Sequence, residues 1–276
     1  MANVLRTFSR WINTNRVSKD SIKINSLWNR SLATEAAVLE KSSNLQEADK
    51  LSALEHEDFF NLKPSFTIKQ LFDARVHFGH KEGTLDPKMK PFIFGSRLGH
   101  IIFDLDSTAE LLFAALNFTA HIAYRDGIIL FVSQNPQTSY LIECTANDCK
   151  EFAHTRLWRQ GTFTNSTMIY GAVTRLPDLV IVLNTLTTVL EQHPVIAEAA
   201  KMAIPVIGIV DSNCNPNLIT YPIPGNDDTP TAVELYCKLF KNAILAVNTR
   251  WLTIILSREM VWDGSHKKTG ELSSIF

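Results

Sequence analysis

Short apolar runs alternate with amphipathic segments along most of this chain. The runs are rich in Ile, Leu, Val and Phe, which is typical of strands buried on both faces of a sheet. Between them, apolar residues such as Leu111, Ala115 and Phe118 recur at helical spacing. The pattern predicts strands over residues 101–105, 128–132, 179–183 and 206–210, and helices over residues 107–124, 136–154, 194–202 and 230–256. This alternation indicates an α/β fold with a doubly wound (flavodoxin-like), mostly parallel sheet and helices on both faces.

The residues before the first of these strands predict how the domain begins. Thr67 and Gln70 have the spacing of a helix capping box, which predicts a short helix over residues 68–75. Upstream, Phe59 and Phe60 predict a short segment that anchors the chain on the domain. We therefore expect a linker and anchoring extension over residues 34–65, an α/β domain over residues 66–258 and a C-terminal tail over residues 259–276.

Proline and glycine mark the approach to the last predicted helix. Residues 218–221 form a short apolar run, which predicts an edge strand. Residues 222–225 read Pro-Ile-Pro-Gly, which predicts a rigid turn. Thr229 and Pro230 then suit the cap and the first position of the long helix.

The first 33 residues differ in composition from the rest of the chain. They hold six Lys and Arg residues, one acidic residue and scattered serines, without a continuous apolar core. This composition is typical of a mitochondrial transit peptide rather than of a secretory signal, and it predicts a protein of the mitochondrial matrix. The alternative is a basic arm that stays on the mature protein. We expect cleavage near residues 30–33.

Without that segment the protein is acidic. The chain has 27 Lys and Arg residues and 28 Asp and Glu residues, of which the part after residue 33 keeps 21 and 27. Such a protein binds nucleic acid only through a local basic patch. No apolar run approaches the roughly 20 residues that a membrane span needs, so we expect no membrane span. The four cysteines form no CxxC pair and predict reduced thiols.

One segment, over residues 76–97, concentrates candidate binding residues. Its cations suit phosphates, its rings suit unpaired bases, and its glycines allow close backbone approach, so it predicts an RNA-binding loop that leads into the first strand of the sheet. The candidates are His77, Phe78, Gly79, His80, Lys81, Lys88, Lys90 and Arg97. In the alternative interpretation, the histidines are core or capping residues. We expect no metal site, because two histidines at this spacing lack a third ligand.

A second interpretation of the first strand is a phosphotransferase. Residues 101–108 read IIFDLDST, which resembles the nucleophile motif of haloacid-dehalogenase-type phosphatases, with Asp104 and Asp106 as the carboxylates. The competing interpretation is that both acids begin the next helix as capping residues, and it is the one we favour. A weaker third interpretation is an interaction protein with nucleotide-binding ancestry.

Five blocks in a fixed order carry a resemblance to a known family. They are VHFGH with PKMKPFIFG and IIFDL, then RLWRQGTFTN, LPDLVIVL, IPVIGIVDSNCNP and YPIPGNDD, and they span about residues 66–250. These blocks resemble the universal small-subunit ribosomal protein two family. Together with the N-terminal segment, they make the chain similar to the mitochondrial, bacterial-type members of that family.

The resemblance implies a non-enzymatic, structural constituent of the mitochondrial small ribosomal subunit that serves mitochondrial translation. Its implied partners are small-subunit ribosomal RNA and neighbouring ribosomal proteins, without a cofactor and without a homo-oligomer. It also adds Arg156, Arg159 and Asn165 as RNA-binding candidates.

The chain departs from the family in two places. Only residues 166–175 separate RLWRQGTFTN from LPDLVIVL, where bacterial members have a long helical hairpin, so we expect this coiled-coil insertion to be absent. In the first of these blocks Gln160 replaces a glycine, and the arginine is displaced to Arg156.

Overall fold

The computed structural model describes residues 54, 56, 58–171, 174–188 and 191–247. The chain divides into two compact units, Met1–Glu57 and Asp58–Phe276, and nearly all described residues belong to the second. The predicted transit peptide, most of the predicted extension and the predicted C-terminal tail lie outside the described residues.

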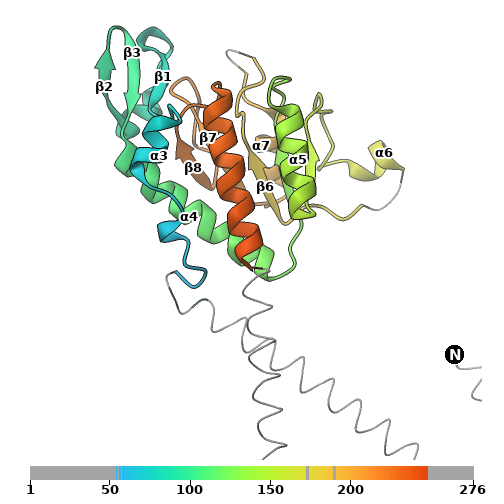
Figure 1. The fold of residues 1–276 in the computed structure, drawn as a ribbon. Helices are drawn as coiled ribbons and strands as arrows, with labels where there is room; N and C mark the ends of the chain where they lie inside the picture. Colours follow the sequence, from blue (N-terminus) through green and yellow to red (C-terminus); the bar gives the residue numbers. More distant parts are fainter. Residues whose placement is uncertain (1–53, 55, 57, 172–173, 189–190, 248–276) are drawn as a thin grey trace, which may run out of the picture. The chain divides into compact units, whose positions relative to one another are not determined.

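Five parallel strands form the main sheet of the described residues (Figure 1). They are β4 (Ile129–Val132), β5 (Phe152–His154), β6 (Leu179–Val182), β7 (Val206–Val210) and β8 (Tyr221–Pro224). The order across the sheet is β5-β4-β6-β7-β8, and each neighbouring pair is parallel. Every residue of β6 and β7 is buried, as expected for strands covered on both faces.

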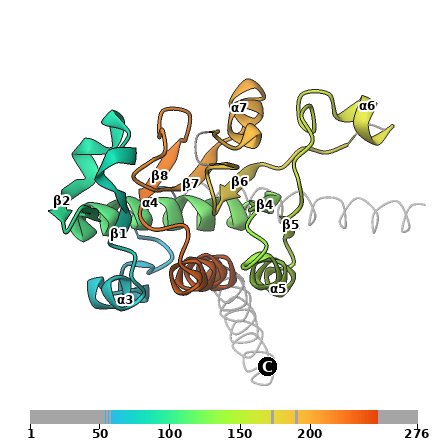
Figure 2. The same ribbon diagram turned by 90° about the horizontal axis from the view of Figure 1, so that it is seen from above.

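Helices flank this sheet. α4 (Leu105–Tyr124) packs against β8, α5 (Ser139–Cys149) against β5, and α7 (Pro194–Lys201) against β7. Seen from above, α7 lies on one side of the strands, whereas α5 and the helix over residues 230–247 lie on the other (Figure 2). The predicted α/β class with a parallel sheet is therefore confirmed. The rest of the helix predicted to residue 256 lies outside the described residues.

The strand before α4 belongs to a different sheet, so its prediction as the first strand of the main sheet was wrong. β1 (Phe78–Lys81), β2 (Ile93–Arg97) and β3 (His100–Phe103) pair antiparallel in the order β1-β3-β2. Leu98 and Gly99 both have positive φ and close a two-residue hairpin between β2 and β3. The short 3-10 helices η2 (Glu82–Thr84) and η3 (Pro87–Phe92) separate β1 from β2. The segment predicted as a loop is thus mostly ordered structure.

Two further predictions were wrong at the edges of the main sheet. The predicted helix over residues 136–154 ends at Cys149, because Lys150 adopts a left-handed conformation with a φ of 61°, and residues 152–154 form β5. Residues predicted as a rigid turn belong to β8. Its prolines, Pro222 and Pro224, are tolerated because an edge strand needs its N–H groups on one side only.

Aromatic contacts with α4 anchor the first residues of the second unit. The rings of Phe59 and Phe60 make edge contacts with Tyr124 at the end of α4. The short helices η1 (Lys63–Ser65) and α3 (Ile68–Asp73) follow. Both hydrogen bonds of the predicted capping box are present, from the N–H of Gln70 to Thr67 Oγ1 and from the N–H of Thr67 to Gln70 Oε1.

One apolar core joins the two sheets. Met89 of η3 and Phe103 of β3 pack in the same buried cluster as Val182 of β6 and Val210 of β7. All four cysteines are free thiols, as predicted. Within the described part of the chain, none of the helices combines the length and the apolar character of a membrane span.

Candidate nucleic-acid interface

Four cations project from the antiparallel sheet and its connection. Met89 is fully buried in the core, and its neighbours in η3, Lys88 and Lys90, are therefore turned toward solvent. Lys81, which ends β1, and Arg97, which ends β2, are exposed as well. We call these four residues the basic face. All of them are cations that the sequence predicted to bind RNA.

The basic face is free of carboxylate partners among the described residues. The Nζ atom of Lys88 lies 3.4 Å from Oδ1 of Asn215, and its backbone N–H donates to the capping carboxylate of Asp86. No hydrogen bond or ion pair to another described residue holds the side chains of the other three. These positive charges are therefore available to an external anion such as phosphate.

His77 is enclosed by aromatic rings. Its ring stacks on that of Phe72 with 4.4 Å between centroids, and it lies 4.1 Å from the ring of Phe78. Burial lowers the pKa of His77, so the ring is neutral at pH 7. Phe78 is 45% exposed, whereas His77 is 8% exposed. The structure therefore leaves Phe78, rather than His77, open to a stacking base.

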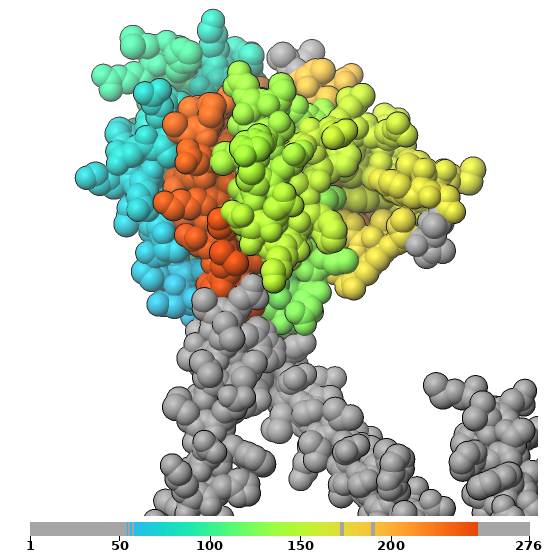
Figure 3. Space-filling view, turned by 45° about the vertical axis from the view of Figure 1, so that its right-hand side comes forward, coloured from blue at the N-terminus to red at the C-terminus, as the bar shows by residue number. Residues whose placement is uncertain are grey.

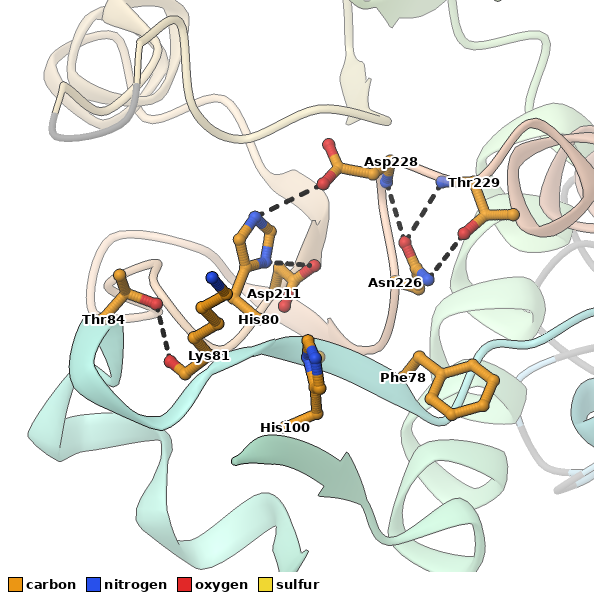
Figure 4. Close-up of a pocket in the computed structure, with 10 residues that line it drawn as sticks. Phe78, His80, Lys81, Thr84, His100, Asp211, Asn226, Asp228 and Thr229 are labelled. Atoms are coloured by element: carbon orange, nitrogen blue, oxygen red, sulfur yellow. Dashed lines mark hydrogen bonds and ion pairs between the residues drawn. The ribbon is translucent and has the colours of Figure 1, made fainter. Parts of the chain in front are cut away.

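His80 lies between two carboxylates (Figure 4). Its Nδ1 atom is 3.1 Å from Oδ2 of Asp211, and its Nε2 atom is 3.3 Å from Oδ2 of Asp228. The hydrogen bond with Asp211, which outweighs burial, raises the pKa of His80 to about 9. The ring is therefore charged at pH 7, and its charge is neutralised inside the protein.

Gly79 serves a contact within the protein. The N–H of His80 donates to Oγ of Ser212 at 2.9 Å, which ties β1 to the residues after β7. A side chain at Gly79 would lie 3.1 Å from the same oxygen and 3.3 Å from Ile101 of β3. A glycine therefore suits position 79, because β1 packs closely against Ser212 and against β3.

The acids beside His80 come from the carboxyl ends of β7 and β8, where ligands bind in open α/β sheets. His80, Asp211 and Asp228 offer one ligand atom each within 4.8 Å of one another, and they border a cavity of about 440 Å³. Asp227 is buried beside them, and burial with the neighbouring carboxylates raises its pKa. Imidazole nitrogen and carboxylate oxygen are both ligands of divalent cations such as zinc, but a metal here would have to displace the proton of the charged His80. The sequence did not indicate this group of three, because His80 was considered there together with His77 alone.

The second predicted basic segment lies after β5, at the opposite edge of the main sheet from β8 (Figure 1). Arg156, Arg159 and Asn165 are exposed, and Asn165 precedes the short helix α6 (Ser166–Tyr170). The side chains of both arginines have no hydrogen bond or ion pair to another described residue. The structure therefore keeps the two predicted basic segments apart rather than bringing them together.

A buried carboxylate holds this second segment. Oε1 of Glu198 in α7 accepts hydrogen bonds from Nε1 of Trp158 at 3.3 Å and from the N–H of Gly161 at 2.6 Å. Its Oε2 atom accepts from the N–H of Phe163 at 2.9 Å. Glu198 is 6% exposed, so these donors satisfy a carboxylate that is largely removed from water. The sequence offered no signal for this role beyond an acid within an apolar helix.

Asp104 and Asp106 lie at the start of α4, as the capping interpretation predicted. Asp104 is the N-cap of α4, and its carboxylate accepts from the N–H of Asp106 at 3.2 Å and from Oγ of Ser107 at 2.6 Å. These two bonds lower the pKa of Asp104. The carboxylate thus satisfies helix N–H groups that have no partner within the helix.

The structure is that of an α/β protein with four exposed cations on and beside its small antiparallel sheet. The family model described as ribosomal protein S2 matches residues 71–176 and 170–247. The chain belongs to the ribosomal protein S2 family, which confirms the resemblance seen in the sequence.

Individual relatives agree with the family. The chain is 58% identical to "Small ribosomal subunit protein uS2m" of Bos taurus over 191 residues, which cover 69% of this chain and 65% of the bovine protein. It is 34% identical to "Small ribosomal subunit protein uS2" of Rickettsia felis over 226 residues, which cover 66% of this chain and 75% of that protein. The matched part thus spans slightly less than two thirds of the bovine relative's length. Both relatives are named as ribosomal proteins rather than as enzymes.

Proposed function

We propose that this chain is a structural constituent of the mitochondrial small ribosomal subunit. The observation that carries the proposal is its 58% identity to the bovine protein named as a small ribosomal subunit protein. In this role the chain binds small-subunit ribosomal RNA and neighbouring ribosomal proteins during mitochondrial translation. It acts as a scaffold, in one copy per subunit, and not as an enzyme or a homo-oligomer.

The basic face is the main RNA-binding surface in this proposal. Lys81, Lys88, Lys90 and Arg97 neutralise phosphates, and Phe78 stacks on an unpaired base. The exposure of these side chains, and the absence of carboxylate partners for the cations among the described residues, support this assignment. A chain with a formal net charge of −1 needs such a local patch to bind RNA.

Three residues in or next to β1 support the basic face from inside the protein. His77 fills the aromatic stack behind Phe78, Gly79 lets β1 approach Ser212, and His80 ties β1 to the acids after β7 and β8. Arg156, Arg159 and Asn165 form a second RNA contact at the opposite edge of the sheet.

The finer architecture in this proposal is doubly wound and flavodoxin-like. Numbered along the chain, the parallel strands have the order 2-1-3-4-5, which is the flavodoxin-like order. The helical hairpin of bacterial members is absent. In its support, the two family segments meet at residues 170–176, next to the five-residue helix α6. The Rickettsia felis alignment also extends over 226 residues while covering 66% of 276, so that relative contains residues that this chain lacks.

The termini have separate roles. Residues 1–33 direct the chain to the mitochondrial matrix, and their arginine-rich, acid-poor composition supports this. Residues 34–65 link and anchor the α/β domain of residues 66–258, and residues 259–276 form a tail that contacts neighbouring subunit proteins.

Charge reversal on the basic face tests the proposal. The tagged full-length chain is expressed in cells, and small subunits are isolated on a density gradient. We expect the double variant Lys88→Glu, Lys90→Glu to enter small subunits several-fold less than the wild type, with unchanged thermal stability. The matched control reverses two exposed lysines on other helices, Lys69→Glu and Lys238→Glu, and should enter normally. If the Lys88→Glu, Lys90→Glu variant entered small subunits normally, the basic face would not be an RNA-binding surface needed for incorporation.

A further inference from the structure

A second cavity lies at the β5 edge of the main sheet. It has a volume of about 640 Å³, and apolar residues of β4 and β5 form its floor. Trp158, residues 162–163, residues 174–177 and Tyr170 of α6 also line it. Figure 3 shows this end of the protein, where the yellow segment with α6 projects beyond the neighbouring residues.

The inner wall of this cavity, which we call the β5 pocket, is aromatic and fixed. Trp158 and Phe163 both line it, with their rings edge to face at 4.9 Å between centroids. Glu198 accepts hydrogen bonds from the indole N–H of Trp158 and from the backbone N–H of Phe163, which fixes the indole ring and the backbone at Phe163. A wall held in this way is formed before any ligand arrives, so binding does not need to order it.

The mouth of the β5 pocket exposes two more rings. Phe152 is 58% exposed and Tyr170 is 55% exposed, although each is a large side chain that lines a cavity. His154 also lines the pocket, and its buried Nδ1 atom has no hydrogen-bond partner among the described residues. Exposed aromatic faces suit a nucleobase, because a base stacks on such rings.

Charge at the β5 pocket favours an anionic ligand. None of its described lining residues is Asp or Glu. Arg175 lines it but is paired with Asp178 at 3.2 Å, so its charge is largely satisfied. Arg156 and Arg159 lie within two residues of Trp158 in the sequence, are exposed, and have no partner among the described residues, although neither lines the pocket. Two unpaired cations this close in sequence to an aromatic cavity complement the phosphates on either side of a base.

We propose that the β5 pocket receives an unpaired base of ribosomal RNA. Phe152 and Tyr170 are its stacking partners, and Arg156 and Arg159 contact the flanking phosphates. This inference rests on the proposed function, and it adds the kind of RNA that the second contact takes: a single strand with an unstacked base, rather than a duplex. An apolar side chain of a neighbouring protein is the other occupant of comparable size, and the unpaired arginines disfavour it.

Binding of a short RNA to the purified full-length chain tests the stacking role. The probe is a labelled uridine oligonucleotide, and a hairpin duplex of equal length is the comparison. We expect Phe152→Ala and Tyr170→Ala each to lower affinity for the single strand about 5- to 150-fold, the effect of losing one stacking aromatic. Met168→Ala is the matched control, because Met168 is 79% exposed in the same helix as Tyr170 but does not line the pocket. Equal affinity of all three variants for the single strand would overturn the proposal.

Ultraviolet cross-linking of isolated mitochondrial small subunits locates the contact in the assembled particle. We expect nucleotide adducts on the peptides that contain Phe152 or Tyr170. If the chain is in the subunit and adducts form on the basic face but not on these peptides, the β5 pocket inference is wrong and the proposed function stands. Cross-links from these peptides to another protein would also overturn the inference. Absence of the chain from small subunits would instead overturn the proposed function.

Discussion

Removing the carboxylate of Glu198 tests most directly what holds residues 158–163 in place. Glu198→Ala takes the acceptor away from three donors, the N–H groups of Gly161 and Phe163 and the indole N–H of Trp158. Because Glu198 is 6% exposed, water reaches few of these groups. Each buried donor left without a partner costs about 1–3 kcal/mol.

The net effect is smaller than the sum over three donors. Three donors set an upper limit of roughly 9 kcal/mol, but the wild-type protein bears the desolvation of a buried charge, which the variant does not. We therefore expect Glu198→Ala to lower the free energy of unfolding by about 3–5 kcal/mol, roughly half of that upper limit. Glu198→Gln keeps the shape and one acceptor oxygen, so its loss should be about 1–3 kcal/mol.

Urea unfolding of the full-length chain, followed by far-ultraviolet circular dichroism, measures these differences. The control is Glu110→Ala, which removes an exposed carboxylate from α4 and should change the free energy of unfolding by less than about 0.5 kcal/mol. If Glu198→Ala were as stable as this control, the three hydrogen bonds would not hold the segment, and the fixed wall of the β5 pocket would lose its basis.

Three further changes test other parts of the structure. Burial lowers the pKa of His193 to about 4, so on acidification the unfolded chain binds a proton that the folded chain does not. This difference in proton binding at His193 should lower the free energy of unfolding by about 2 kcal/mol from pH 7 to pH 5. His193→Asn should lose that part of the pH dependence in urea titrations, and an unchanged pH profile would refute the assignment. Gly225→Ala would set a methyl group against the hydroxyl of the buried Tyr236 and should lower stability by about 1–3 kcal/mol. Gly83→Ala meets no atom within 4 Å and should be near neutral, so equal melting temperatures for both glycine variants would contradict the packing. Asp104→Ala removes the cap of α4 and should lower stability by about 1 kcal/mol while leaving entry into small subunits intact; loss of entry without loss of stability would mean that Asp104 has another role.

Structure that depends on neighbouring residues was predictable from the sequence. The capping box of Thr67 and Gln70 formed as its spacing indicated, and Asp104 caps α4. The apolar runs became β6 and β7, because only a sheet covered on both faces buries every residue of such a strand. The four cations of the basic face are exposed, but they lie on two strands and a 3-10 helix rather than on the predicted loop.

Structure that depends on distant residues was not predictable in this way. β5 has three residues and follows a helix that one left-handed residue, Lys150, terminates, and neither fact leaves a periodic pattern. Residues 101–105 were predicted as a strand, but β1 and β2 were missed because they mix polar and apolar positions without a clear alternation. His80 was predicted as an RNA-binding residue, and its carboxylate partners after β7 and β8 become visible only once the strands are assembled. The same holds for Glu198, whose charge is explained by donors from another segment.

Sedimentation of a mitochondrial lysate after a high-salt wash tests the central claim most directly. The gradient fractions are probed for this chain and for small-subunit ribosomal RNA, with and without RNase. A constituent of the small subunit should stay in the small-subunit peak at one copy per RNA and move to light fractions after RNase. A chain that runs at monomer size without RNase, while the small-subunit peak is intact, would contradict the ribosomal role.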